Sequence, residues 1–174
     1  MTWWESLLDD DTHGPRSPVR VALPEDEAGV LAMLRLMHAE GGMRDADGRP
    51  FPLCEAMVSD TVRRGVARGH CGVIGKPGGE VEASICLDAG HPWYSKKEFL
   101  GDYWCFVRPE FRRTSHAHAL WAWAKALAAQ HQMPLSLGIV SAERTAAKDR
   151  LLERHIGAKR YGSTFLYHPP GGAL

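Results

Sequence analysis

The stretch from Phe99 to Gln130 constrains the fold most, because a strand pattern changes into a helix pattern within a few residues. The segment from Tyr103 to Val107 is aromatic and β-branched apart from one cysteine, and Pro109 ends it. Apolar residues then recur at the spacing of one helix face: Ala117, Leu120, Trp121, Ala124, Leu127 and Ala128. The sequence therefore predicts a strand, a short turn and a long helix in succession.

The turn between this strand and this helix is basic and rich in small residues. It carries Arg108, Arg112 and Arg113, and Thr114 and Ser115 come directly before the apolar helix. The first N–H groups of a helix have no partner inside the helix, and the helix dipole places partial positive charge there. Arginines at that end add charge-assisted hydrogen bonds. We therefore expect the turn to hold a phosphate group.

Seven residues of this segment resemble the acyl-CoA-binding motif of the GNAT N-acyltransferase superfamily, V-x-P-x-[YF]-R-x-x-G-x-[GA]-x-x-L. They are Val107, Pro109, Phe111, Arg112, Ser115, Ala117 and Leu120. Ser115 stands where the motif has its first glycine, which permits positive φ and close approach of a phosphate. A serine hydroxyl can instead cap the helix or donate to a phosphate. The resemblance implies binding of acetyl-CoA or another acyl-CoA by Phe106, Val107, Arg112, Arg113, Thr114, Ser115, His116 and Ala117.

The order of the predicted elements extends this resemblance over residues 19–168. We expect strands near 19–23, 70–75, 81–87, 103–107, 135–140 and 161–168, and helices near 24–40, 53–68, 117–128 and 141–156. This order resembles the GNAT fold, an α/β (α+β) fold. It implies a central mixed, mostly antiparallel sheet of six or seven strands flanked by about four helices. Residues 1–18 are predicted to be an N-terminal extension, and residues 169–174 a tail.

The strands near 70–75 and 81–87 are predicted to form a hairpin, because the turn Lys76-Pro77-Gly78-Gly79 joins them. The second strand of this hairpin alternates. Val81, Ala83, Ile85 and Leu87 are expected on one face, and Glu82, Ser84, Cys86 and Asp88 on the other. A loop, AGHPWYSKKE, then leads to the central strand. In the resembled family such a loop often borders the acceptor site, so Trp93 and Tyr94 either line that site or have a structural role.

Composition limits the other classes of function. The chain has 174 residues, enough for one domain with a real core, and a formal net charge of zero. No overall field draws it to nucleic acid or to an anionic membrane, and no apolar run approaches the roughly 18 residues of a membrane span. The N-terminus is acidic and unlike a signal peptide. The four cysteines are scattered, so we expect reduced thiols and a cytoplasmic protein.

Acyl transfer to an amine needs a base, an oxyanion donor and a proton for the leaving thiolate. The resemblance implies that a backbone N–H near Phe106 or Val107 is the oxyanion donor. Asp102 is the first candidate base, on the face of Trp104 and Phe106 by alternation, and Glu98 is the second. A solvated aspartate at a strand entrance is the alternative for Asp102.

Many family members carry a tyrosine as the acid in the helix after the fifth strand. Here the matching position is Leu151 or Leu152. Tyr161 is the substitute that we name as a catalytic candidate; His155 and Ser141 are others, and a thiolate can also leave into water.

We expect no metal site. His116 and His118 are two residues apart on a helix and so do not share a face, and no acidic residue or cysteine joins them at ligand spacing. Trp121 and Trp123 lie on opposite sides of the same helix. That helix is therefore either buried on both sides or part of a subunit interface, which leaves a homodimer open.

The resemblance implies a small acyl-CoA-dependent N-acyltransferase, an N-acetyltransferase in the first instance. It would act by direct attack of a primary amine on a small molecule or a protein. Two alternatives remain. One is a catalytically degenerate CoA-binding or protein-interaction module, favoured by Ser115 and the missing tyrosine. The other is an acyltransferase toxin acting on charged tRNA, against which the zero net charge counts.

Overall fold

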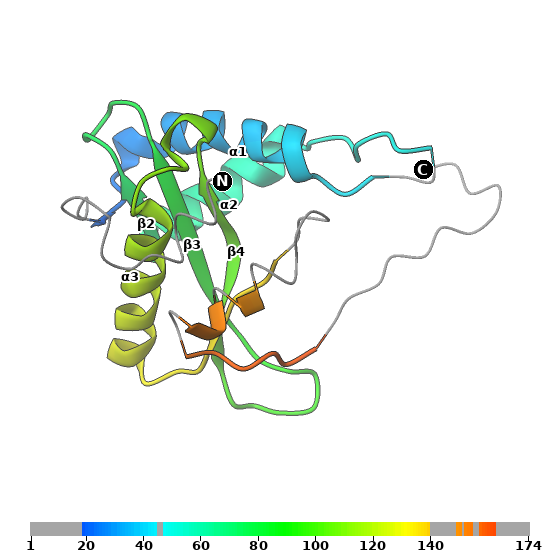
Figure 1. Cartoon of the computed structure of the whole chain (residues 1–174), viewed down its shortest axis with the longest axis vertical. Coiled ribbons are helices and arrows are strands. Elements are labelled where there is room, and N and C mark those ends of the chain that lie inside the picture. The colour runs from blue at the N-terminus through cyan, green and yellow to red at the C-terminus, as the bar shows by residue number, and fades with distance from the viewer. Residues whose placement is uncertain (1–18, 45–46, 140–148, 151, 155–156, 163–174) are drawn as a thin grey trace.

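The computed structural model describes residues 19–44, 47–139, 149–150, 152–154 and 157–162 (Figure 1). Five strands and three α-helices are defined among these residues: β1 (Arg20–Val21), α1 (Glu27–Gly41), α2 (Glu55–Ala67), β2 (Cys71–Ile74), β3 (Ala83–Gly90), β4 (Phe99–Val107), α3 (His116–His131) and β5 (Leu135–Ser136). Two 3-10 helices, η2 (Pro24–Asp26) and η3 (Pro109–Phe111), precede α1 and α3. Residues 149–150 and 152–154 are also helical.

The strands form one sheet in the order β1-β2-β3-β4-β5. All neighbouring pairs are antiparallel except β4 and β5, which are parallel. The predicted fold class, a mixed and mostly antiparallel sheet flanked by helices, is confirmed. The described strands number five rather than six or seven. Of the expected closing strand, Tyr161 and Gly162 are not in a strand, and residues 163–168 lie outside the described residues, as do most of residues 141–156.

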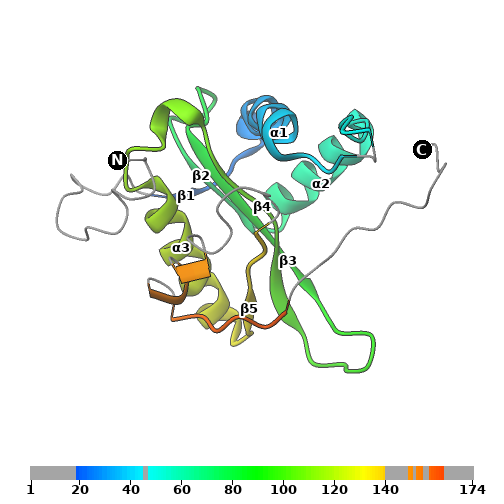
Figure 2. The ribbon, with the colours of Figure 1, turned by 45° about the vertical axis from the view of Figure 1, so that its right-hand side comes forward.

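Helices cover both faces of the sheet, with α1 and α2 on one side and α3 on the other (Figure 2). Ala83, Ile85 and Leu87 of β3 pack in the core on the α3 side, whereas Cys86 packs on the α1/α2 side. The expected alternation of β3 is thus confirmed for these residues. Val81 was expected beside Ala83 but packs on the α1/α2 side, because it precedes β3 and follows the hairpin turn.

A β-bulge interrupts β4. Leu87 pairs with Asp102 and Cys86 pairs with Trp104, so Tyr103 is an extra residue in β4. Trp104 and Phe106 belong to the core on the α1/α2 side, and Leu100 and Cys105 to the core on the α3 side. Asp102, two residues after Leu100, therefore lies on the α3 side. The prediction that it shares a face with Trp104 and Phe106 is wrong, because the bulge reverses the alternation.

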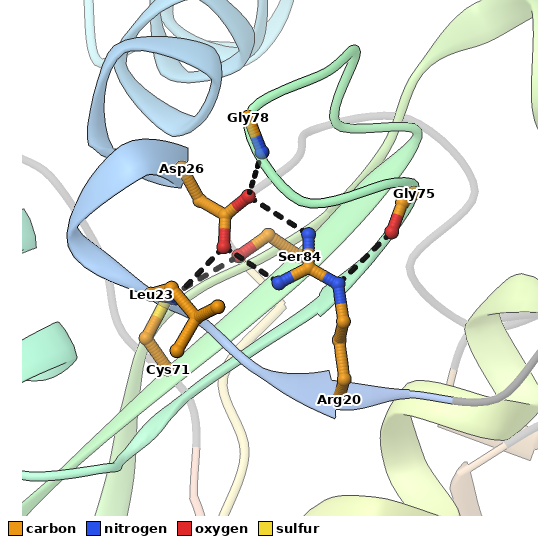
Figure 3. A network of polar contacts seen from close by, with 7 residues as sticks. All are labelled: Arg20, Leu23, Asp26, Cys71, Gly75, Gly78 and Ser84. Carbon is orange, nitrogen blue, oxygen red and sulfur yellow. Dashed lines mark hydrogen bonds and ion pairs between the residues drawn. The ribbon is translucent and has the colours of Figure 1, made fainter.

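A buried ion pair fastens η2 to β1 and to the β2–β3 hairpin (Figure 3). The Asp26 carboxylate is 0% exposed and accepts two hydrogen bonds from the Arg20 guanidinium, at 2.6 and 2.8 Å. It also accepts from the backbone N–H groups of Leu23, at 2.8 Å, and Gly78, at 3.2 Å. Arg20 Nε donates to Gly75 O at 3.0 Å. Gly75 (φ +133°) and Gly78 (φ +65°) adopt backbone conformations that favour glycine, which explains these two glycines of the turn.

In the part of the chain that the structure describes, no helix has the length and apolar character needed to cross a membrane.

Candidate functional site

The outer edge of β4 separates from β5 and leaves backbone groups unpaired with that strand. Within the described residues, β5 pairs only with Leu100 and Gly101, whereas β4 continues to Val107. Arg108 N–H donates to Glu82 O at 3.0 Å, toward β3, and alternate residues of a strand direct their backbone groups to opposite edges. Cys105 and Val107 therefore direct their N–H groups away from β3. Of the two predicted oxyanion donors, Val107 faces the open edge and Phe106 faces β3.

The turn after β4 leads directly into the N-terminus of α3, as the sequence predicts. The cap differs from the expected one, because the Ser115 side chain makes no capping hydrogen bond. The Thr114 hydroxyl oxygen instead accepts from His116 N–H at 3.3 Å, and the hydroxyl donates to Phe111 O at 2.6 Å. Ser115 has φ −79° and ψ 10°, so serine causes no backbone strain at the position of the motif's glycine.

Arg112 and Arg113, which lie just before α3, have different surroundings. Arg112 points back toward α1, where it forms an ion pair with Glu40. Its guanidinium carbon lies 5.3 Å from the centre of the Phe106 ring, and its Nε donates to Val107 O at 3.2 Å. Arg113 is exposed beside the start of α3. Arg113 is therefore the better placed of the two to meet an anion at the helix N-terminus.

His116 anchors the start of α3 to the sheet. Its Nε2 lies 2.7 Å from Glu82 Oε2, and its ring stacks on Phe111 with centroids 5.8 Å apart. The side chain is buried, as is Ala117 next to it. His116, predicted to contact acyl-CoA, thus also has a structural role. Its partner Glu82 was not predicted, because the two residues are 34 positions apart and no local sequence pattern pairs them.

Asp102 lies beside the separation of β4 and β5. Its Oδ1 accepts from Gly138 N–H at 2.7 Å, and Gly138 follows β5. Burial raises the pKa of Asp102 above its ordinary value, although the Gly138 hydrogen bond partly opposes that shift. A carboxylate with a raised pKa is a stronger base than a solvated one. The solvated-aspartate alternative thus fits poorly, because Asp102 is partly buried and hydrogen-bonded.

The candidate acid and the second candidate base lie in exposed positions. Tyr161 is 94% exposed, and its hydroxyl lies 3.2 Å from the Tyr94 hydroxyl. Glu98 is also exposed, just before β4. His155 and Ser141 lie outside the described residues. The structure thus joins Tyr161 to the β3–β4 loop, and none of its described contacts reaches Asp102.

All four cysteines are free thiols in the structure. Cys105, on the α3 side of β4, is the one nearest in sequence to Asp102, and burial raises the pKa of its thiol to about 12. Among the described residues, no group of three or more histidine, cysteine, aspartate or glutamate side chains is arranged to hold a metal ion. The expected absence of metal stays a prediction.

No protein-family model matches this sequence, and neither does any curated protein. Solved structures of acetyltransferases nevertheless share its fold. The aminoglycoside acetyltransferase AAC(6')-Iy, solved with the bisubstrate analogue CoA-S-monomethyl-acetylneamine, superposes with a TM-score of 0.62 at 12% identity over 89% of this chain and 99% of that chain. A Trypanosoma brucei acetyltransferase gives a TM-score of 0.59 at 15% identity over 87% and 98%.

A third structure, a predicted acetyltransferase from Clostridium acetobutylicum solved with acetyl-CoA, gives a TM-score of 0.61 at 13% identity over 86% of this chain and 94% of that chain. These neighbours are GNAT acetyltransferases, so the resemblance noted in the sequence is confirmed for the fold. The chain has the GNAT acetyltransferase fold.

Proposed function

We propose that this protein is an acyl-CoA-dependent N-acyltransferase that transfers an acyl group, an acetyl group in the first instance, to a primary amine. The main support is the open edge of β4, where the N–H groups of Cys105 and Val107 point outward. The N-terminus of α3 lies at one end of this edge, and Asp102 lies toward the other. Two fold neighbours are solved with CoA or related molecules, AAC(6')-Iy with CoA and with a CoA bisubstrate analogue and the Clostridium acetobutylicum protein with acetyl-CoA, which supports the same co-substrate class here.

The residues at the start of α3 fit an anionic pyrophosphate. Arg113 is an exposed cation, the helix dipole is positive there, and Ala117 N–H belongs to the first turn, where no intrahelical acceptor exists. Val107 N–H, on the open edge, suits a carbonyl oxygen of the co-substrate. Arg112 would keep the turn in place through Glu40 rather than bind phosphate itself.

In the proposed reaction Asp102 is the base, and the thiol of Cys105 takes no part. Asp102 would take a proton from the amine, directly or through a water, so that the nitrogen attacks the thioester carbonyl. The C–N bond forms, the C–S bond breaks, and the thiolate leaves to be protonated by water. Cys105 is a poor nucleophile because a thiol with a pKa of about 12 is almost entirely protonated at neutral pH, which favours direct attack over an acyl-cysteine.

A two-part experiment tests this function. Calorimetry with CoA comes first, comparing the wild type with Arg113→Glu and with Lys125→Glu, a matched charge reversal at an exposed position of α3. We expect Arg113→Glu to weaken CoA binding about 10- to 150-fold, the range of a hydrogen bond to a charged group, and Lys125→Glu to leave it unchanged. Equal affinities in all three proteins would refute the site.

A screen of amine acceptors with acetyl-CoA, followed by thiol release, then tests catalysis. We expect turnover with at least one amine. Two fold neighbours are aminoglycoside acetyltransferases, so aminoglycosides form the first set of acceptors and peptides with free amino groups the second. CoA binding without turnover on any acceptor would favour the degenerate CoA-binding module instead.

A further inference from the structure

Two segments at one end of the sheet present large aromatic side chains to solvent. Trp93 and Tyr94, in the loop that joins β3 to β4, are 93% and 63% exposed. Tyr161, in the segment 157–162, is 94% exposed. The β3–β4 loop projects beyond the helices at the end of the sheet opposite η3 (Figures 1 and 2). Exposed aromatic residues gathered in this way mark an interaction surface.

The three rings form one cluster, which we call the aromatic tip (Trp93, Tyr94 and Tyr161). The Trp93 and Tyr94 rings meet edge to face, with centroids 5.4 Å apart and planes at 88°. The hydroxyl groups of Tyr94 and Tyr161 lie 3.2 Å apart and join the two segments. The contacts within the tip cover little of the rings, because all three side chains stay more than half exposed.

The charge around the aromatic tip differs from that of the whole chain. Residues 91–98 and 157–162 contain Lys96, Lys97, Lys159 and Arg160 against a single acidic residue, Glu98, in a chain whose net charge is zero. Arg160 forms an ion pair with Asp149 at 3.8 Å. The three lysines are exposed. The two segments that carry the rings are therefore mostly basic, although the whole chain is neutral.

We propose that the aromatic tip binds single-stranded nucleic acid, with bases stacked on the rings and phosphates beside the three lysines. Such proteins combine stacking rings with cations that follow the backbone, and stacking tolerates any base. An acidic peptide would satisfy the lysines but would not need flat ring surfaces. A second copy of the chain would bring two basic tips together, which like-charge repulsion disfavours. This proposal does not depend on the proposed acyltransferase activity.

Fluorescence anisotropy with a labelled single-stranded oligouridylate of about 10 nucleotides tests the proposal, because such sites cover roughly 4–16 nucleotides. Trp93→Ala is compared with Met57→Ala, an exposed apolar residue on α2, and Lys96→Glu/Lys97→Glu with Lys125→Glu. The positions are exposed, and circular dichroism checks that each variant folds. We expect wild-type binding with a slope of log K against log[salt] near −1.4 to −2.1, for two or three phosphate contacts.

Trp93→Ala should weaken binding about 5- to 150-fold, the range for one stacked base, and the double lysine variant should lower the salt slope. Met57→Ala and Lys125→Glu should bind as the wild type does. Absence of oligouridylate binding at low salt would overturn the proposal, as would equal losses in the matched controls. Displacement of the oligonucleotide by polyglutamate at equal charge concentration would assign the surface to acidic peptides. Self-association that Trp93→Ala abolishes would assign it to a second copy.

Discussion

Two aspartates of this fold have opposite surroundings: Asp26, which is fully buried, and Asp102, which is partly buried. Asp26 accepts from a paired guanidinium and two backbone N–H groups, and its pKa falls to about 2, chiefly through the hydrogen bonds from Arg20. Asp102 accepts one described hydrogen bond from another residue, Gly138 N–H, and burial raises its pKa. The fold stabilises one negative charge and disfavours the other.

This difference separates a structural carboxylate from a reactive one. A buried carboxylate with every acceptor site satisfied is a fixed charge that holds elements together, and its proton affinity is too low to take a proton at neutral pH. A carboxylate that lacks a cation partner costs stability but gains basicity. Asp102 is such a carboxylate, and it lies near the open edge of β4, where the proposed reaction needs a base.

Replacing Asp102 with asparagine should affect the rate most. The amide keeps the shape and can still accept from Gly138 N–H, but it cannot take a proton. We expect turnover with an active acceptor to fall about 10²- to 10⁴-fold, and to recover partly at higher pH because more amine is already neutral. Initial rates of thiol release across pH measure both effects.

The matched variant for this experiment is Glu98→Gln, because Glu98 is an exposed acid just before β4, the strand that contains Asp102. A normal rate in Asp102→Asn together with a low rate in Glu98→Gln would transfer the role of base to Glu98. Thermal unfolding separates chemistry from folding. Because the folded protein disfavours the Asp102 charge, Asp102→Asn should unfold at the wild-type temperature or above it.

Replacing Asp26 with asparagine should affect stability instead. It leaves the Arg20 guanidinium without its anion. It also turns one of the two carboxylate oxygens into an NH2 group, so that either Leu23 N–H or Gly78 N–H loses its acceptor. Breaking a buried ion pair typically costs about 3–5 kcal/mol, and we expect the lower end because the Arg20 side chain is 25% exposed. Urea unfolding measures the loss. Glu25→Gln, an exposed acid of the same 3-10 helix, is the control and should stay within about 0.5 kcal/mol.

The pH dependence of stability should also differ between the two aspartates. The pKa of Asp26 falls from 3.8 to about 2 on folding. The Asp26 charge therefore adds to the free energy of unfolding above pH 3.8, and this contribution is lost as pH falls through about 2. That contribution is about 2 kcal/mol, and the stability gap between wild type and Asp26→Asn should shrink by this amount in acid.

For Asp102 the pH dependence of stability has the opposite sign. Its folded pKa lies above 3.8, so the wild type should lose stability relative to Asp102→Asn as pH rises through the interval above 3.8. Unfolding curves of both variants at several pH values would test the comparison directly. Parallel pH profiles for the two variants would contradict the opposite surroundings assigned to the two carboxylates.

Much of the fold was predictable because it depends on local patterns. The helical spacing after Thr114 and the Gly-rich turn between β2 and β3 each define an element without help from distant residues. The bulge at Tyr103 was not predictable, since nothing in the aromatic run 103–107 marks one residue as extra. Because the bulge was not predicted, Asp102 was expected on the wrong face of the sheet.

The candidate site was predictable only where it consists of a contiguous motif. The turn from Arg112 to Ala117 was found from its sequence, but the partner of Arg112 is Glu40, 72 positions earlier. Gly138, which donates to Asp102, is 36 positions away and donates through its backbone, which leaves no trace in the side-chain sequence. Contacts of this kind depend on the packing of the whole sheet, and a single sequence does not encode them locally.

Cys105 provides the smallest expected effect and distinguishes direct attack from a covalent route. It lies on the α3 side of β4, three residues after Asp102, and its thiol has a pKa of about 12. At neutral pH only about one thiol in 10⁵ would be ionised, which is too few for an efficient nucleophile. Cys105→Ala should therefore change turnover less than about fivefold, a change attributable to packing beside Trp121. Cys54→Ala, at an exposed position, is the control.

Intact-mass measurement after incubation with acetyl-CoA and no acceptor gives the second readout. Direct attack predicts no acylated protein, because without an amine the thioester has no competent nucleophile in the site. An acyl-cysteine route predicts one added acyl group in the wild type, its absence in Cys105→Ala, and a loss of turnover of 10²-fold or more. In that case the Asp102 carboxylate would take the proton of the Cys105 thiol, and the role of Asp102 as base toward the amine would have to be abandoned.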